Sequence, residues 1–240
     1  MKTVRRAVAF ALAITTIFAC QKAEYEGTAS FSLEEGNVAE ITRSKVSDYA
    51  PLPAGDAFEI LVKNTGSGAT IYNGSINGWD NGKKWPSGNY SVEAACGDED
   101  EEGRMKPYFY GKTAFEIKGG QNTEVAVDVS LGNCIVKISC TDLFKSYYPE
   151  YSFTIKTPNN SAGFKYEGEA IFVAYQFSVT GTVTSQAGKQ SILEEKTWKG
   201  EPATCYTITY DVSNVGGVLV SISFDDSVQT VQCGEIDLNS

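Results

Sequence analysis

The residue whose position most clearly indicates covalent chemistry is Cys20, which stands directly after an apolar run. Residues 1–19 begin with three basic side chains and continue as an apolar stretch from Ala7, the pattern of an export signal. That stretch is shorter than the roughly 20 apolar residues that a membrane-spanning helix needs. The segment from Ile17 to Cys20 resembles the bacterial lipobox, in which the cysteine thiol is diacylated and the chain is cut before it. We expect Cys20 to be lipidated; the alternative is an incidental cysteine in an ordinary signal peptide.

Lipidation of Cys20 would determine where the protein resides. Each buried acyl methylene contributes ~0.8 kcal/mol, and two chains give a stable anchor where one gives only marginal binding. We therefore expect the membrane to be a partner through the lipid on Cys20. The expected location is the outer membrane, with the body of the protein either at the cell surface or facing the periplasm.

Four aromatic side chains are candidate ligand-binding residues. In "PYFYG" (107–111) the alternation of a strand sends Tyr108 and Tyr110 to one face and Phe109 to the other, so that one face packs and the other offers rings to solvent. Trp79 and Trp85 stand on the Gly/Asn-rich loop "NGWDNGKKWPSG". Exposed rings can stack on sugars or contact a protein partner. The alternative is that both tryptophans fasten the loop to the edge of a sheet.

The acidic loop "GDEDEEGR" (97–104) carries five carboxylates in succession. Calcium prefers several oxygen ligands on a flexible loop, but the positions of Gly and Glu do not fit an EF-hand. We expect a solvated charged loop and predict no metal site, with calcium binding as the alternative.

The composition excludes several classes of function. The chain has no histidine, which removes the usual Ser-His-Asp and Cys-His catalytic sites, histidine-bound zinc and histidine-bound haem. The formal net charge is −10, and removal of the three basic residues of the signal changes it to −13, so nucleic acid is not an expected partner. A Walker-type phosphate loop is also missing. We therefore predict a protein that is not an enzyme and has no cofactor.

Five cysteines remain after Cys20, so at least one thiol is unpaired. Cys134 and Cys140 stand in phase on one predicted strand, about 20 Å apart, and cannot bridge each other. Two interpretations of these cysteines remain open: they are small buried hydrophobic residues, or one other pair of them forms a disulfide.

The elements that must position these residues are strands. Apolar and polar residues alternate with period two in segments rich in β-branched and aromatic residues, separated by Gly, Asn, Asp and Pro clusters. The predicted strands are 58–64, 90–96, 113–119, 123–130, 134–140, 151–157, 177–185, 205–213 and 218–224. A helical turn is predicted only within 141–151, with Thr141 or Asp142 as its cap and Pro149 as its end. The pattern predicts an all-β protein of about fifteen short strands.

About 210 residues of strands suit two tandem β-sandwich-like domains, Greek-key or transthyretin-like, with minimal helix. We place the division near 131–133, where a Gly-Asn break separates two strands. The predicted organisation is a lipoprotein signal peptide at 1–19, a lipidated tether at 20–27, a first domain at 28–131 and a second at 132–240.

An ordered series of motifs resembles a known family. It consists of "PSGNYSVEA", the acidic loop, "PYFYG", "TEVAVDVS", the strand "CIVKISC" and "FKSYYPEYSFTI". This order resembles the domain of unknown function 4493 family, lipobox-bearing proteins of Bacteroidetes, with fimbrillin-like surface proteins as a distant analogy. The resemblance implies a noncatalytic cell-envelope lipoprotein that acts as a binding, adhesion or surface-assembly module, with surface proteins or glycans as partners. The alternative is a glycan-binding surface lipoprotein that uses its loop aromatics. The resemblance supplies no catalytic residues.

Overall fold

The structure is a computed structural model that describes residues 25–34, 40–41, 44–212, 218–224 and 227–236. Cys20 lies outside the described residues. The predicted all-β class is confirmed, since strands dominate and α1 (Asp142–Tyr147) is the one α-helix in the described ranges. As predicted, Thr141 is its N-cap, because the Thr141 hydroxyl accepts a hydrogen bond from the amide of Phe144 at 3.1 Å. None of the helices in the described part of the chain has the length and apolarity to cross a membrane.

The first half of the chain forms a three-stranded sheet, β6-β1-β9, that faces a five-stranded sheet, β10-β8-β7-β4-β5. The strands are β1 (Glu26–Glu34), β4 (Glu59–Asn64), β5 (Thr70–Ser75), β6 (Trp85–Pro86), β7 (Gly88–Cys96), β8 (Phe109–Ile117), β9 (Asn122–Asp128) and β10 (Ser130–Leu131). Alternation decides which side chains face inward: Tyr90, Val92 and Ala94 of β7 are all buried. They share one core with Val125 and Val127 of the facing sheet.

The second half repeats this two-sheet plan, with β14-β11-β17-β18-β19 facing β13-β12-β15-β16. The strands are β11 (Cys134–Cys140), β12 (Glu150–Lys156), β13 (Phe164–Lys165), β14 (Ile171–Val173), β15 (Gln176–Thr184), β16 (Gln190–Lys199), β17 (Cys205–Val212), β18 (Val218–Phe224) and β19 (Ser227–Ile236). The predicted strands 134–140 and 218–224 coincide with β11 and β18. The predicted pair of tandem β-sandwich-like domains is confirmed.

Each half contains one parallel strand pair within an otherwise antiparallel arrangement. β1 runs parallel to β9, and β11 runs parallel to β17. β1 was missed by the sequence analysis and begins at Glu26, inside the segment predicted to be the tether. Parallel neighbours need a long crossover, so the first strand of each half is paired by a strand much later in the chain.

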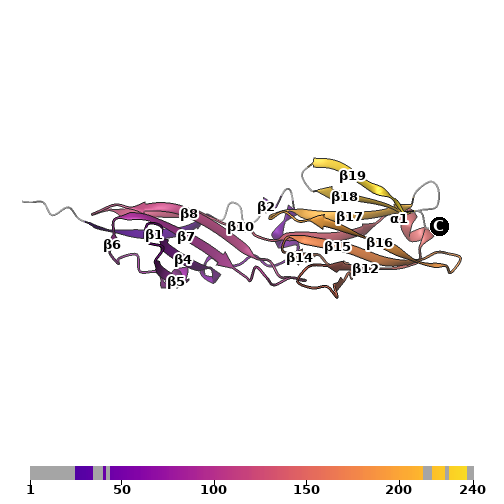
Figure 1. Cartoon of the computed structure of the whole chain (residues 1–240), viewed down its shortest axis with the longest axis horizontal. Helices are drawn as coiled ribbons and strands as arrows, with labels where there is room; N and C mark the ends of the chain where they lie inside the picture. The colour runs from indigo at the N-terminus through magenta and orange to yellow at the C-terminus, as the bar shows by residue number, and fades with distance from the viewer. Residues whose placement is uncertain (1–24, 35–39, 42–43, 213–217, 225–226, 237–240) are drawn as a thin grey trace, which may run out of the picture.

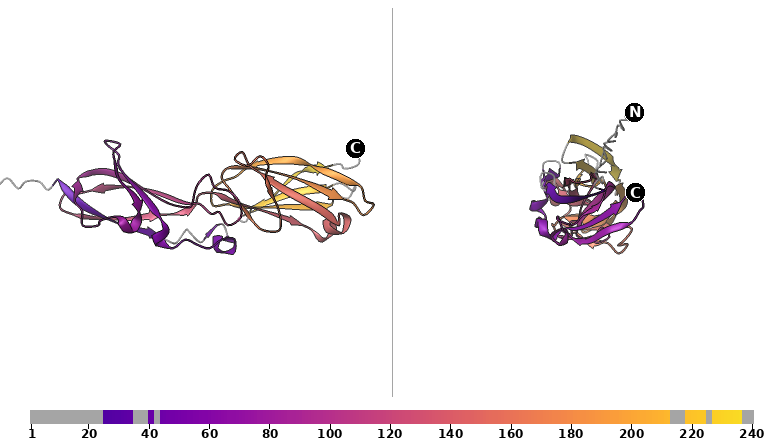
Figure 2. Two further views of the ribbon diagram at one scale, coloured as in Figure 1. Left: turned by 90° about the horizontal axis from the view of Figure 1, so that it is seen from below. Right: turned by 90° about the vertical axis from the view of Figure 1, so that its left-hand side faces the viewer.

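The two halves lie end to end, and their ribbons meet where β10 and β14 approach each other (Figure 1; Figure 2, left). The strands of the first two sheets all precede Gly132, and those of the next two all follow it. We therefore retain 28–131 and 132–240 as the proposed domains. The junction is packed, because Ile135, Phe172 and Cys205 of the second half belong to the core cluster of the first.

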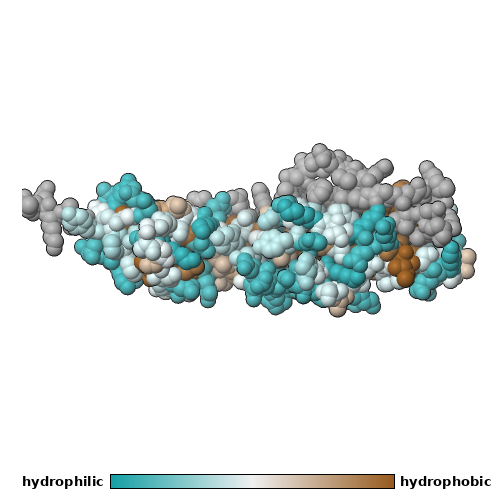
Figure 3. All heavy atoms as spheres, in the orientation of Figure 1, coloured by the Kyte–Doolittle hydropathy of each residue, from teal (hydrophilic) through white to brown (hydrophobic). Residues whose placement is uncertain are grey.

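An early segment also reaches the second half. The short pair β2 (Glu40–Ile41) and β3 (Ser44–Lys45) leads into the 3-10 helix η2 (Val46–Asp48). The hydroxyl of Tyr49 then accepts a hydrogen bond from Nζ of Lys137 at 2.7 Å. The view in Figure 3 shows a mainly hydrophilic face, on which hydrophobic residues gather in small separate areas, one of them near α1.

Candidate functional site

A groove of about 560 Å³ lies where the first half meets the second. Its floor is the outer face of β4, β7 and β8, and the second half contributes Tyr175 and Pro202 to its wall. Tyr108 and Tyr110 both line it. We refer to it as the junction groove. Its volume is in the range of small-molecule sites.

Tyr110 of β8 and Tyr108, directly before this strand, both line the groove, whereas Phe109 between them faces the core, as the sequence predicts. Phe109 between them is 1% exposed and belongs to the core of the first half, whereas Tyr108 and Tyr110 are half-buried. Their rings are stacked, with centroids 6.2 Å apart and planes at 27°. The groove lining therefore contains two aromatic rings in contact with each other.

The backbone after β10 fixes the position of Tyr108. A Cβ built on Gly132 would lie 2.6 Å from Cδ1 of the Tyr108 ring, so only glycine leaves room for the ring there. The buried side chain of Asn133 accepts a hydrogen bond from the amide of Tyr108 at 3.3 Å and donates one to the carbonyl of Lys106 at 2.9 Å. The carbonyl of Asn133 accepts a hydrogen bond from the amide of Ala203, next to Pro202, at 3.0 Å. Asn133 thus connects the aromatic strand to the opposite wall.

Carboxylates surround the rings. Glu59, Glu93 and Glu99 line the groove, and Glu93 is ion-paired to Nζ of Lys112 at 2.7 Å. Burial and the nearby Glu99 raise the pKa of Tyr108 to about 12. Burial and Glu93 also raise the pKa of Tyr110. Both tyrosines therefore keep their hydroxyl protons at neutral pH and can donate hydrogen bonds.

Trp79 and Trp85 are not part of the junction groove. Trp79 is 7% exposed, and its Nε1 donates a buried hydrogen bond to the carbonyl of Ala29 at 2.8 Å. Its ring packs against Phe31 at 4.9 Å and stacks on the half-buried Trp85 at 5.6 Å. The hypothesis that Trp79 offers its ring to solvent is wrong: the tryptophans fasten the loop to β1, which is the packing alternative.

The acidic loop agrees with the prediction of a solvated charged loop from Asp98 to Glu101, which are exposed, and departs from it at Glu102. The Glu102 carboxylate crosses the junction and accepts hydrogen bonds from the Thr157 hydroxyl and, at 2.9 Å, from the amide of Ala174. Gly103 and Phe172 exchange two backbone hydrogen bonds, each of 2.9 Å.

The next residue, Arg104, adds ion pairs to this contact. Its guanidinium lies 3.0 Å from carboxylate oxygens of both Glu167 and Glu169 and donates a hydrogen bond to the carbonyl of Lys165. The loop therefore joins the two halves instead of standing free in solvent. Within the described ranges, no group of three or more acidic or cysteine side chains is placed to hold a metal ion.

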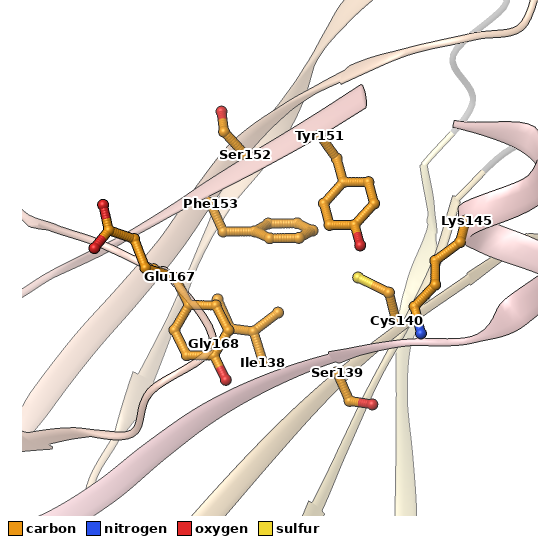
Figure 4. A pocket seen from close by; sticks show the side chains of 10 residues that line it. Ile138, Ser139, Cys140, Lys145, Tyr151, Ser152, Phe153, Glu167 and Gly168 are labelled. Atoms are coloured by element: carbon orange, nitrogen blue, oxygen red, sulfur yellow. The ribbon is translucent and has the colours of Figure 1, made fainter. Parts of the chain in front are cut away.

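A second cavity, of about 400 Å³, opens in the side of the second half (Figure 4). Phe153 and Tyr151 lie above it, with Ile138 and Cys140 below and Lys145 at one end (Figure 4). Burial raises the pKa of the Cys140 thiol to about 11, so that thiol is protonated and poorly nucleophilic at neutral pH.

Several residues of the junction groove were not found from the sequence. Tyr175, from the second half, is 59% exposed and lines the same groove as Tyr108. Glu59, Glu93 and Asn73 come from three different strands, so only the folded sheet brings them together. The glycine-asparagine pair at 132–133 was recognised as a break between strands, and its tertiary role was not.

Residues 25–240 match the family described as "Domain of unknown function (DUF4493)". A comparison with the curated proteins finds no relative of this chain.

Several solved structures are similar to this chain at low sequence identity. A proposed polysaccharide-binding protein (DUF1812) from Bacteroides thetaiotaomicron is 11% identical with a TM-score of 0.45, over 87% of this chain and 99% of that one. A proposed cell adhesion protein from Bacteroides uniformis is 16% identical with a TM-score of 0.44, over 84% and 98%. The fimbrial anchor protein Mfa2 from Porphyromonas gingivalis is 10% identical with a TM-score of 0.42, over 85% and 98%.

Proposed function

The chain belongs to the DUF4493 family, and we propose that it is a noncatalytic cell-envelope lipoprotein that acts as a binding, adhesion or surface-assembly module and holds a glycan in the junction groove. The observation that supports a glycan as the ligand is the stacked pair of Tyr108 and Tyr110 in an open groove. Sugar rings present apolar C–H faces that pack on aromatic rings, and their hydroxyls need hydrogen-bond partners around the rim. Both requirements are met in this groove.

The polar rim suits hydroxyl groups. Asn73 and Ser130 stand on strands that border the rings, and Glu59 and Glu99 supply acceptors. The hydroxyl of Tyr108 supplies a donor, while the hydroxyl of Tyr110 is hydrogen-bonded to Glu93. A few polar groups around an apolar surface are typical of small-ligand sites, where they fix the orientation of the ligand.

The location of the protein rests on the sequence. The lipobox-like segment that ends at Cys20 supports a lipid anchor in the outer membrane, and the described body of the protein would extend from it. Protease shaving of intact cells that express the wild type or Cys20→Ala tests this. We expect the wild type in the membrane fraction and accessible to protease, and Cys20→Ala in the soluble fraction. A membrane-bound wild type that resists protease would place the protein on the periplasmic side and rule out adhesion outside the cell.

A glycan array tests the binding function. The unlipidated chain, with Cys20→Ser, and its Tyr108→Ala/Tyr110→Ala double variant are applied to the same array. Tyr147→Ala serves as the matched control, because Tyr147 is exposed at the far end of the second half. We expect array binding by the wild type and the control and none by the double variant. Equal binding by all three proteins would show that the junction groove is not the glycan-binding site. If none of them bound any glycan, the proposal that the ligand is a glycan would be wrong.

A further inference from the structure

We propose that the glycan held in the junction groove carries protonated amino groups, so that the groove is specific for an amino sugar. This inference rests on the proposed function and names the ligand class of the same site. It follows from the charge balance of the lining residues, from the aromatic rings among them and from the hydrogen-bonded state of the groove floor.

The carboxylates of the groove exceed the positive charges near them. Of the three, Glu93 has Lys112 as its partner at 2.7 Å. Among the residues that the structure describes, neither Glu59 nor Glu99 has a basic side chain within 4 Å, the distance that defines an ion pair. A neutral ligand would leave these two negative charges uncompensated when it displaced water from the groove. A cationic ligand would gain from both.

The aromatic rings of the groove also favour a positively charged ligand. The face of a tyrosine ring carries negative electrostatic potential and attracts ammonium groups. Tyr108, Tyr110 and the exposed Tyr175 all line the groove. Glu99 and Tyr175 both act electrostatically on Tyr108, so this carboxylate and the third ring lie near the stacked pair. Rings and carboxylates together would surround an ammonium group.

The groove floor favours a sugar over a basic peptide. An extended peptide usually gains affinity by adding a strand to an exposed sheet edge. The floor here is the face of a sheet, where Leu61 pairs with Glu93 and Ala95 pairs with Tyr110 in neighbouring strands. The backbone groups of these central strands, β4, β7 and β8, are thus already used by their neighbours, and a peptide lying across them could not add a strand there. A sugar needs only rings and side-chain hydrogen bonds.

The test compares two oligosaccharides that differ in one group per residue. A hexamer of glucosamine and a hexamer of N-acetylglucosamine are titrated calorimetrically into the Cys20→Ser chain at about pH 6, where carboxylates are ionised. We expect the glucosamine hexamer to bind about tenfold more tightly in low salt, because an ammonium gains both ring and carboxylate contacts. The difference should shrink as salt screens the charges.

Variants connect the preference to the groove. Glu99→Gln is expected to reduce the preference for the glucosamine hexamer several-fold, because it removes one free carboxylate and preserves the shape. Glu116→Gln is the control, since Glu116 is an exposed glutamate of β8, the strand of Tyr110, and lies outside the groove. Melting curves of the two variants that match the wild type would show that both are folded.

Each remaining result has one meaning. Equal affinity for the two hexamers, or tighter binding of the acetylated one, would overturn the amino-sugar proposal and leave the glycan function intact. If a lysine hexapeptide bound as tightly as the glucosamine hexamer, the groove would recognise positive charge alone, and the proposal that the cationic ligand is a sugar would be wrong. If neither hexamer nor any neutral glycan binds, the proposed function itself fails.

Discussion

The carboxylate of Glu102 accepts a hydrogen bond from the backbone amide of Ala174 at 2.9 Å, across the junction between the two halves of the chain. Both residues stand next to the wall of the junction groove: Glu99 lies three residues before Glu102, and Tyr175 follows Ala174. The contact therefore holds a groove carboxylate and a groove ring at a fixed separation. A rigid groove loses less conformational entropy when it binds a ligand.

Replacement of Glu102 tests this contact. Glu102→Ala leaves the amide of Ala174 and the hydroxyl of Thr157 without their acceptor, and an unsatisfied buried donor costs ~1–3 kcal/mol. We expect the free energy of unfolding, measured with urea, to fall by that amount. Glu101→Ala is the control, because Glu101 is exposed on the same loop and pairs only with Lys106 at the surface, so its loss should change stability by ~0.5 kcal/mol or less. Equal effects of the two variants would contradict the role of Glu102.

Gly132 should control the position of the Tyr108 ring. In Gly132→Ala, the added methyl group would lie 2.6 Å from Cδ1 of the ring, too close for van der Waals contact, so the ring must move. We expect weaker glycan binding, together with a changed near-ultraviolet circular dichroism signal from the tyrosines. Gly188→Ala introduces a methyl group with no neighbour within 4 Å, although φ there is +78°, and should leave binding unchanged. Unaltered binding by Gly132→Ala would show that Tyr108 does not need this position.

Trp79 is expected to matter for stability and not for binding. Its ring is buried among Phe31, Tyr72 and Trp85, and removal of a buried tryptophan ring costs ~3–5 kcal/mol. Trp79→Ala should lower the urea midpoint accordingly. Trp79→Phe keeps an aromatic ring and loses the hydrogen bond to the carbonyl of Ala29, so we expect an intermediate loss. If the Trp79→Ala protein were folded, had unchanged stability and bound no glycan, Trp79 would be a ligand contact and this prediction would be wrong.

The titration of Tyr108 gives stability a defined dependence on alkaline pH. The pKa of this side chain is raised to about 12 in the folded chain, against about 10 in an unfolded one. Below pH ~10 both states hold the proton, so the contribution to stability is complete; between ~10 and ~12 only the folded state holds it, and stability falls as the pH rises. Tyr108→Phe should make this loss less steep in urea unfolding at several pH values. Phenolate absorbance that shows every tyrosine titrating near pH 10 would contradict the raised value.

The sequence predicts strands well where alternation is strict. In β11 and β18 the bounds agree with the prediction, and in β8 the alternation of Tyr108, Phe109 and Tyr110 is enough to assign each ring to a face. The short helix was also predicted, because a threonine cap and a following proline delimit it. These features depend on residues close together in the sequence, so sequence patterns are enough to predict them.

What the sequence does not reveal depends on contacts between distant residues. Glu102 is indistinguishable from its acidic neighbours until the fold brings the amide of Ala174 to it. Trp79 stands on a polar loop, yet β1, an unpredicted strand, provides the carbonyl and the ring that bury it. The groove likewise requires side chains from β4, β7 and β8 and from the second half.

We propose that the tyrosines of the junction groove, and not the loop tryptophans, hold the ligand. Calorimetric titration of the strongest glycan from the array into Tyr110→Ala and Trp85→Ala separates the two. Tyr110 lines the groove, whereas Trp85 is half-buried against Trp79 and under Nζ of Lys83 at 4.3 Å. We expect a loss of at least about tenfold in affinity, about 1.4 kcal/mol, for Tyr110→Ala and unchanged affinity for Trp85→Ala. A folded Tyr110→Ala protein that binds like the wild type, with affinity lost in Trp85→Ala, would contradict it.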